Sequence, residues 1–322
     1  MAEPFPATLT VTDRPSPTDQ QQVLALVGRA ADVDGHRAVN EAGVLALRRS
    51  SRDPAAGPAP WHVLAHDHDH DGSLVGYAQA VWEESGPVAA LVVDPKHRRH
   101  GIGSALWRRL AGQIEAPLRV WASGDAAAAR ALAAAEGLEP IRTLQVLGRP
   151  LSGDLPPTDP PAGTTIRAFR PGQDDEGWLE VNARAFASHP EQGSLNQADL
   201  EQRMAEPWFD PAGFFVAVRN APDAESPDGP ILGFHWTKRE PDAATGEVYV
   251  IGVDPAAGVR GLGTPLLGVG LHHLRDSGAS AVDLYVEADN ARALALYHRY
   301  GFSLVTADVM YAAPAPPAET SG

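Results

Sequence analysis

The second half of the chain alternates short apolar runs with amphipathic stretches, a pattern that predicts strands and helices in mixed order. The predicted strands are Thr165–Phe169, Phe214–Val218, Ile231–Lys238, Glu247–Val253, Ala281–Val286 and Leu304–Tyr311, and the predicted helices are Gly172–Ala187, Gln197–Ala205, Arg260–Ser277 and Asn290–Tyr300. The first half follows a similar order, with strands at Trp61–Ala65, Leu74–Trp82, Pro87–Val93 and Leu118–Ala122, a helix after Gly101, and a helix at Ala126–Glu136. Both halves therefore predict a mixed α/β fold.

Two separated motifs occur once in each half. A strand ending in Asp94-Pro95 precedes a glycine-rich turn at Gly101, and a strand ending in Asp254-Pro255 precedes a similar turn at Gly261, 160 residues later. A downstream helix that ends in Glu-Gly-Leu or Tyr-Gly-Phe recurs at nearly the same offset. The chain is therefore interpreted as a tandem duplication.

Proline-rich composition places the boundary between the halves. Residues 150–162 are rich in Pro and lack apolar periodicity, which is typical of an extended, semi-rigid linker. We predict an N-terminal domain over residues 1–149, a C-terminal domain over residues 163–312 and a disordered tail over residues 313–322.

Composition and charge exclude several classes of protein. Lys and Arg total 26 against 41 Asp and Glu, and a net charge of −15 argues against a nucleic-acid partner. No cysteine is present, which excludes disulfides and thiolate chemistry. No apolar run approaches a membrane span and no secretory leader is visible, so a cytoplasmic monomer without a membrane partner is expected.

The glycine-rich turns predict an anion site. Each turn lies between a strand and a helix, where the first helical amides lack partners and the helix dipole favours negative charge. A glycine there lets a phosphate approach the backbone. One such turn is weak evidence for a phosphate-binding site, but two copies, each after a strand that ends in Asp-Pro, make that interpretation stronger.

These turns, with the helix pattern Asn290-x-x-Ala293-x-x-x-Tyr297-x-x-x-Gly301-Phe302, resemble the GNAT superfamily of acyl-CoA-dependent N-acetyltransferases. The resemblance covers both halves and implies two tandem GNAT domains, with acetyl-CoA as cosubstrate and no metal. It implies coenzyme contacts at Leu91, Val92, Val93, Arg98, Arg99, His100, Gly101, Ile102 and Gly103 in the first half, and at Ile251, Gly252, Val253, Gly258, Val259, Arg260, Gly261, Leu262, Gly263, Thr264, Asn290, Ala291, Arg292, Ala293, Leu294 and Ala295 in the second. Gly258 departs from the signature, which has Gln or Arg there.

Segments beyond this signature resemble one tandem-domain branch of the superfamily. They are Ala185–Gly193, Trp208–Pro211, Gly233–Lys238, Gly246–Val250 and Leu284–Glu287. Members of that branch acetylate the cysteinyl amine of a cysteine–glucosamine–inositol conjugate, so the resemblance implies a small, thiol-containing pseudodisaccharide substrate. It also implies substrate contacts at Glu41, Glu191, Lys238, Glu247 and Tyr285.

Acetyl transfer to an amine needs a base for the ammonium and an acid for the departing thiolate. By resemblance, Glu247 is the general base and Tyr297 the acid. Position by position, the first half has Pro87 where the second has Glu247, and Ala133 where the second has Tyr297. The first half is therefore predicted to keep the coenzyme turn without transferring acetyl.

Two other functions stay open at the level of sequence. A tandem GNAT enzyme acting on another amine, such as an aminoglycoside, a polyamine or a protein N-terminus, would have the same turns. An acyl-CoA sensor without turnover would not need both Glu247 and Tyr297. The run His66–Asp71 has metal-ligand residue types but is interpreted as a solvated hairpin loop, and the basic run Lys96–His100 as phosphate-binding.

Overall fold

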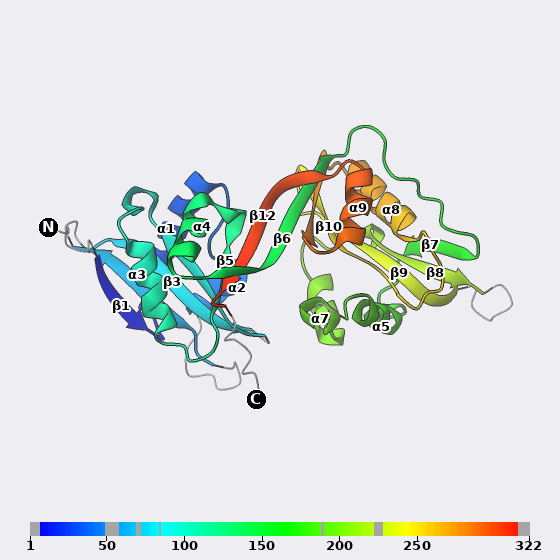
Figure 1. Cartoon of the computed structure of the whole chain (residues 1–322). Helices are drawn as coiled ribbons and strands as arrows, with labels where there is room; N and C mark the ends of the chain where they lie inside the picture. Colours follow the sequence, from blue (N-terminus) through cyan, green and yellow to red (C-terminus); the bar gives the residue numbers. More distant parts are fainter. Residues whose placement is uncertain are drawn as a thin grey trace, which may run out of the picture. The chain divides into compact units, whose positions relative to one another are not determined.

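The computed structural model describes residues 7–48, 58–68, 72–83, 85–187, 190–221 and 228–314; among these, the side chains of residues 41, 42, 48, 190 and 191 are not described. The chain divides into two compact units (Figure 1). Unit 1 contains Met1–Leu144 and Thr306–Gly322, and unit 2 contains Gln145–Val305.

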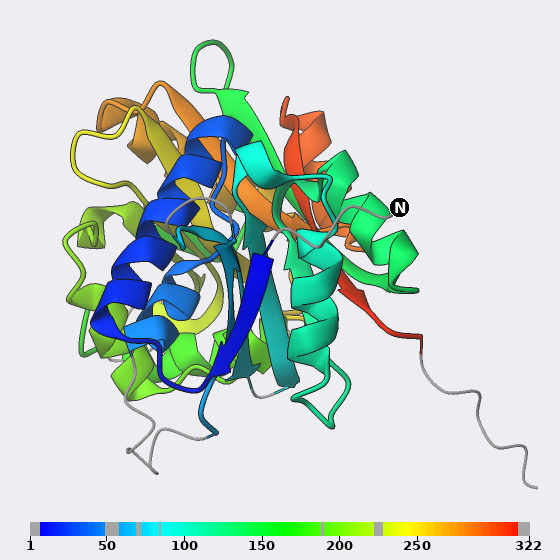
Figure 2. The same cartoon turned by 90° about the vertical axis from the view of Figure 1, so that its left-hand side faces the viewer.

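Unit 1 is a sheet covered by helices on both faces. Its elements are β1 (Ala7–Thr12), α1 (Pro17–Asp34), α2 (Glu41–Arg48), β2 (Trp61–Asp67), β3 (Leu74–Glu83), β4 (Gly86–Val93), α3 (Ile102–Ala111), β5 (Arg119–Ala122), α4 (Ala127–Ala135), the start of β6 (Glu139–Pro150) and the end of β12 (Ser303–Ala312). The strand order is β1-β2-β3-β4-β5-β12. Helix α1 packs Leu26 on one face, and α3 packs Leu106 on the other (Figure 2).

Unit 2 repeats this plan. Its elements are the end of β6, β7 (Thr164–Ala168), α5 (Asp175–Ala185), α6 (Pro190–Gly193), α7 (Gln197–Met204), β8 (Phe214–Asn220), β9 (Asp228–Lys238), β10 (Thr245–Val253), α8 (Gly263–Asp276), β11 (Ala281–Glu287) and α9 (Ala291–Arg299). The strand order is β6-β11-β10-β9-β8-β7. Helices α5 and α7 cover one face through Trp178 and Leu200, and α8 and α9 cover the other through Leu271 and Tyr297.

Every helix and strand predicted from the sequence has a counterpart within a few residues, but β1, α1, α2, β6 and the short α6 were missed. Helix α1 begins with a capping box at Ser16 and Asp19, which local sequence offers. Its buried residues, Val23, Leu26, Val27 and Ala30, follow the spacing i, i+3, i+4 and i+7 of an amphipathic helix. The sequence therefore contained the signal for this helix, and the prediction overlooked it.

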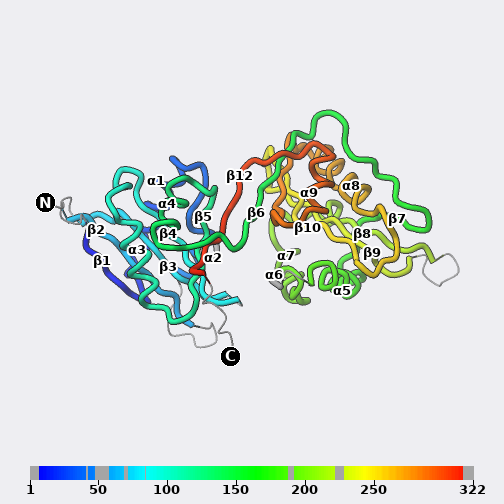
Figure 3. The backbone as a smooth tube through the Cα atoms, in the orientation of Figure 1, coloured from blue at the N-terminus to red at the C-terminus, as the bar shows by residue number. Residues whose placement is uncertain are grey.

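The division into units differs from the division into halves. The last strand, predicted as part of the second half, closes the sheet of unit 1 instead, because Val309–Ala312 of β12 pairs antiparallel with Arg119–Ala122 of β5. Figure 3 follows the chain from green β6 into unit 2 and back along red β12 to unit 1. Unit 1 is therefore completed by residues from the far end of the chain, whereas unit 2 is one continuous segment.

The proline-rich segment after Pro150 is irregular in conformation but lies inside unit 2. Leu151 is buried, and its N–H donates to the carbonyl of Ser280 at 2.9 Å. The carbonyls of Pro156 and Pro157 lie so close to Gly268 of α8 that a Cβ there would stand 2.5 Å from the Pro157 oxygen. The segment therefore packs along a helix of unit 2. Residues 315–322 of the predicted tail lie outside the described residues.

Two buried histidines make the stability of the fold pH-dependent. His62 of unit 1 lies 2.6 Å through Nδ1 from the Tyr77 hydroxyl, and His235 of unit 2 lies 2.6 Å through Nδ1 from the Leu266 carbonyl. The Nε2 atom of each ring is buried without a partner in the described part of the chain. Burial lowers the pKa of both side chains to about 4, so both are neutral in the folded protein.

We expect the free energy of unfolding to fall as the pH drops from 6.5 to 4. Below pH ~6.5 both histidines bind protons in the unfolded chain but stay neutral in the folded chain. Each histidine then lowers the free energy of unfolding by up to about 1.4 kcal/mol per pH unit. Urea unfolding across this range measures the slope. The change His62→Gln should remove the part due to His62 and leave that of His235, whereas a stability independent of pH in this window would contradict the assignment.

Candidate active site

The same ion pair supports the end of the central strand in each unit. Arg29 of α1 binds Asp94 through Nε (3.0 Å) and a terminal nitrogen (2.9 Å), and Arg184 of α5 binds Asp254 at 3.0 and 2.9 Å. Each aspartate also accepts a backbone N–H two residues later, at 3.0 and 2.8 Å. The Asp-Pro motif is therefore a structural anchor that fixes where each glycine-rich turn begins.

The turns that follow leave the helix N-termini without side-chain caps. Neither α3 nor α8 has a capping side chain, so their first amides stay available to an anion. Gly101 (φ 80°), Gly258 (φ 66°) and Gly261 (φ 87°) take the left-handed conformation, which favours glycine. This geometry fits a pyrophosphate at both turns.

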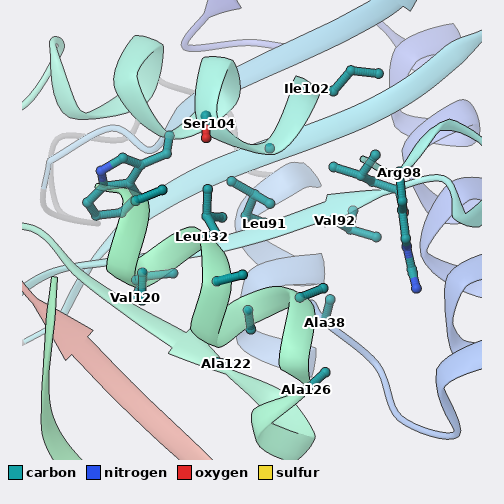
Figure 4. A pocket seen from close by; sticks show the side chains of 18 of the residues that line it. Ala38, Leu91, Val92, Arg98, Ile102, Ser104, Val120, Ala122, Ala126 and Leu132 are labelled. Atoms are coloured by element: carbon teal, nitrogen blue, oxygen red, sulfur yellow. The ribbon is translucent and has the colours of Figure 1, made fainter. Parts of the chain in front are cut away.

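Unit 1 contains a cavity of about 420 Å³ beside its turn. It opens where β4 and β5 part, since their parallel pairing covers only Val88–Ala89 and Arg119–Val120. Figure 4 shows Leu91, Val120, Ala122 and Leu132 converging on it, with Arg98 at one end. All the residues predicted as coenzyme contacts in this half line the cavity, with the exception of His100.

The guanidinium of Arg98 is already paired within unit 1. It donates to both carboxylate oxygens of Asp34, at 2.8 and 2.7 Å, and to the Val93 carbonyl at 3.1 Å. The hydrogen bond from Arg98 lowers the pKa of Asp34. An anion in this cavity would therefore meet the turn amides and an arginine whose charge is balanced.

In unit 2 the pairing of β10 with β9 has an irregularity that the corresponding pair of unit 1, β4 with β3, does not have. The pairing of β10 with β9 shifts between Val248 and Val250, so Tyr249 is an extra residue, whereas β4 pairs with β3 without a shift. The parallel register of β10 with β11 covers Thr245–Val248 and Ala281–Leu284. A β-bulge changes the direction of a strand and of its side chains, and bulges often lie beside active sites.

Glu247 stands just before this bulge, between two charged neighbours. It is in register with Lys238 on β9 and with Asp283 on β11, so the three side chains project on the face that α5 and α7 cover. Burial raises the pKa of Glu247, while Lys238 opposes the rise and Asp283 and Glu240 add to it. A carboxylate with a raised pKa is a suitable proton acceptor for an amine.

Lys238 is held over aromatic rings. Its Nζ lies 5.0 Å from the centroid of Trp208 and 5.9 Å from that of Tyr249, and 3.5 Å from a carboxylate oxygen of Glu240. Tyr249 also accepts a hydrogen bond from Arg203 at 3.2 Å. These contacts fix the ammonium beside Glu247.

Tyr297 lies on the opposite side of the sheet. It packs with Val248, Leu284 and Phe302, and its ring meets Phe302 edge-on at 5.6 Å between centroids. Burial raises its pKa to about 12, so the phenol is protonated at neutral pH. Within the described residues no hydrogen bond joins it to Glu247, and a reacting group would have to lie between the two, where β10 and β11 part.

Residues 39–136 and 178–302 match the acetyltransferase (GNAT) family. The chain belongs to this family. The mycothiol acetyltransferase of Catenulispora acidiphila is 47% identical over 316 residues, which cover 94% of this chain and 98% of the relative. That of Streptomyces avermitilis is 48% identical over 301 residues, 92% of each chain. The branch predicted from the second half, the mycothiol acetyltransferases or mycothiol synthases, is confirmed.

Solved structures share the architecture. The GCN5-related N-acetyltransferase from Sphaerobacter thermophilus superposes with a TM-score of 0.67 at 22% identity, over 94% of this chain and 95% of that one. The tandem GNAT protein from the clavulanic acid biosynthesis pathway gives 0.65 at 20% identity, over 96% and 99%. The predicted fold class, an α/β chain of two tandem GNAT domains, is confirmed.

The two GNAT units differ at the positions of Glu247 and Tyr297. Counting along the sequence aligned Glu247 with Pro87, but the strand register aligns it with Val88, which pairs with Val81 and Arg119 as Glu247 pairs with Lys238 and Asp283. The bulge at Tyr249 explains this one-residue correction. Unit 1 therefore presents an apolar side chain where unit 2 has its carboxylate.

The other predicted site residues fall on the following elements of the two units. Ile251, Gly252 and Val253 end β10, Gly258–Leu262 form the turn into α8, and Gly263 and Thr264 begin that helix. Asn290 caps α9 by accepting the N–H of Ala293 at 3.1 Å, and Ala291–Ala295 form its first turns. Tyr285 is 54% exposed on β11. Glu41 begins α2 and Glu191 lies in α6, but both side chains fall outside the described residues.

Sequence reasoning missed four residues around Glu247: Arg203, Trp208, Tyr249 and Asp283. Alternation along β11 places Asp283 on the same face as Tyr285, and this could have identified it. The position of Tyr249 depends on the bulge, and no local sequence pattern predicted that bulge.

Within the described ranges, no group of three or more His, Asp or Glu side chains could hold a metal ion. Residues 69–71 of the histidine-rich hairpin lie outside those ranges. Over the same described part of the chain, no helix has both the length and the apolar character needed to cross a bilayer.

Proposed function

We propose that the chain transfers acetyl from acetyl-CoA to the cysteinyl amine of the cysteine–glucosamine–inositol conjugate, desacetylmycothiol, giving mycothiol and coenzyme A. The observation that carries this proposal is Glu247, a partly buried carboxylate with a raised pKa, next to Lys238 and the strand bulge. The names of the relatives support the choice of substrate.

Glu247 and Tyr297 supply the proton transfers. Bound acetyl-CoA presents a thioester. Glu247 accepts a proton from the acceptor ammonium, directly or through a water, so that the free amine can form its bond to the acetyl carbon. Tyr297, protonated at neutral pH, gives its proton to the sulfur as the carbon–sulfur bond breaks. The second proton, which the nitrogen loses as the amide forms, passes to the tyrosinate directly or through water and restores the phenol. Glu247 then returns its proton to solvent.

The turn into α8 would hold the coenzyme phosphates in unit 2. The uncapped amides of α8 and the left-handed Gly258 and Gly261 support this, and Arg260 is the cation of the turn. Pro265 in the first helical turn removes one N–H donor, so Arg260 and the glycine amides carry most of the binding.

The N-terminal unit would not transfer acetyl. Its turn and cavity are suited to a coenzyme, but Val88 and Ala133 stand where unit 2 has Glu247 and Tyr297. We propose that the C-terminal unit alone is catalytic. We assign Glu41, Glu191, Lys238, Glu247 and Tyr285 to the substrate. The cytoplasmic location and the monomeric state stay predictions from the sequence.

Acetyl transfer to purified cysteinyl-glucosaminyl-inositol, followed by the mass of the product, tests this function. A thiol-release assay would be confused by the sulfhydryl of the substrate itself. N-acetylated product at a turnover far above that with free cysteine or glucosamine supports the proposal. Bound acetyl-CoA without product would contradict it and favour another amine or a sensor role.

A further inference from the structure

Asp283 is a second carboxylate next to the proposed base. It is in register with Glu247 across the parallel pair of β10 and β11, so both side chains project from the same face at the same level. Burial raises the pKa of Asp283, and its charge raises that of Glu247. Like charges directly opposite one another on neighbouring strands are destabilising, so this pair carries a cost that a cation between them would relieve.

A missing side chain on the neighbouring strand makes room for Asp283. A Cβ built on Gly148 of β6 would lie 2.5 Å from Oδ1 of Asp283 and 2.8 Å from Cγ2 of Val305. Gly148 has no left-handed backbone that would require a glycine. Because β6 and β10 lie on opposite sides of β11, this space lets the Asp283 carboxylate lean toward β6, so that the two carboxylates do not have to touch and a cation can lie between them.

The nearby cation does not neutralise this pair. Lys238 lies on the other side of Glu247, where its ammonium contacts the carboxylate of Glu240 and the rings of Trp208 and Tyr249. Two carboxylates, Glu240 and Asp283, and one lysine, Lys238, thus act on the carboxylate of Glu247. The local excess of negative charge is suited to one more cation.

We infer that Asp283 binds the ammonium group of the acceptor and holds it against Glu247. This inference rests on the proposed function. It explains how an amine arrives in its charged form at the group that deprotonates it: the ammonium donates one hydrogen bond to Asp283 and gives a proton to Glu247. The product amide has no positive charge, so Asp283 favours substrate over product.

The change Asp283→Asn tests the inference in the full-length enzyme, once the wild type has been shown to acetylate the acceptor. We expect the acceptor KM to rise about tenfold, as for loss of one charged hydrogen bond. The KM of acetyl-CoA should stay the same. The inhibition constant of the uncharged acetylated product should also stay the same, which a general loss of structure would not allow.

Two further variants keep the test decisive. Glu240→Gln removes a carboxylate that also faces Glu247 but lies beside Lys238, and it should change the acceptor KM far less than Asp283→Asn does. Gly148→Ala displaces the Asp283 carboxylate without removing its charge and should raise the acceptor KM in the same selective way. An acceptor KM within twofold of wild type in Asp283→Asn, or an equal loss of product affinity, would overturn the inference.

Discussion

Replacing Glu247 by Gln is expected to lower turnover by about 10²- to 10⁴-fold, the usual contribution of a positioned general base. Gln is nearly isosteric and keeps the strand register with Lys238 and Asp283, but it cannot accept the proton of the ammonium. Acetyl-CoA binding should be almost unchanged, because the turn into α8 and the amides of that helix are untouched.

The pH profile distinguishes this role from a structural one. In the wild type, kcat/KM should rise with pH as Glu247 loses its proton, at a pKa above that of an exposed glutamate because the side chain is buried. In the Glu247→Gln variant, kcat/KM should no longer show this rise with pH. Full turnover in Glu247→Gln, measured by product mass, would remove Glu247 from the mechanism.

Deleting Thr306–Gly322 is expected to unfold much of unit 1, although the deletion lies at the far end of the sequence. These residues contribute Val309 and Tyr311 to a buried cluster with Ala133. The Tyr311 hydroxyl donates to Asp125 at 2.9 Å, and Asp308 accepts the N–H of Gly124 at 2.8 Å. Without them β5 keeps only a two-residue pairing with β4.

Burial of Val309 and Tyr311 alone stabilises unit 1 by about 3–6 kcal/mol, at ~1.5–3 kcal/mol for each large side chain. A loss of this size is comparable to the whole stability of a small domain. Hydrogen exchange should show β5 and α4 losing protection, with unit 2 strands β8 and β9 retained. A fragment that ends near Pro150 should fail to fold for the same reason.

A shorter deletion serves as the control. Removing only residues 315–322 leaves the β12–β5 pairing intact and should not change the protection of β5. If the chain that ends at Val305 protected β5 and α4 as well as the full chain does, the last strand would not be part of unit 1.

The duplication and the GNAT signature could be taken from the sequence, because they depend on short-range features, while the roles of Glu247 and Tyr297 are proposals that the resemblance to the family implies. An Asp-Pro strand end, a glycine-rich turn and an amphipathic helix are each encoded within about ten residues, where the conformational preferences of glycine and proline act directly. The contrast between Tyr297 and Ala133 likewise needed only the periodicity of one helix.

The tertiary structure decided what depends on pairing between distant segments. Strand register, set by the bulge at Tyr249, makes Val88 rather than Pro87 the counterpart of Glu247. Pairing with β5 gives the last strand to unit 1, and the parallel register of β10 with β11 places Asp283 beside Glu247. A strand can form its backbone hydrogen bonds with any neighbouring strand whose apolar side chains lie on the same face of the sheet. The sequence of one strand therefore does not determine which strand it pairs with, and the packing of the whole sheet decides the pairing.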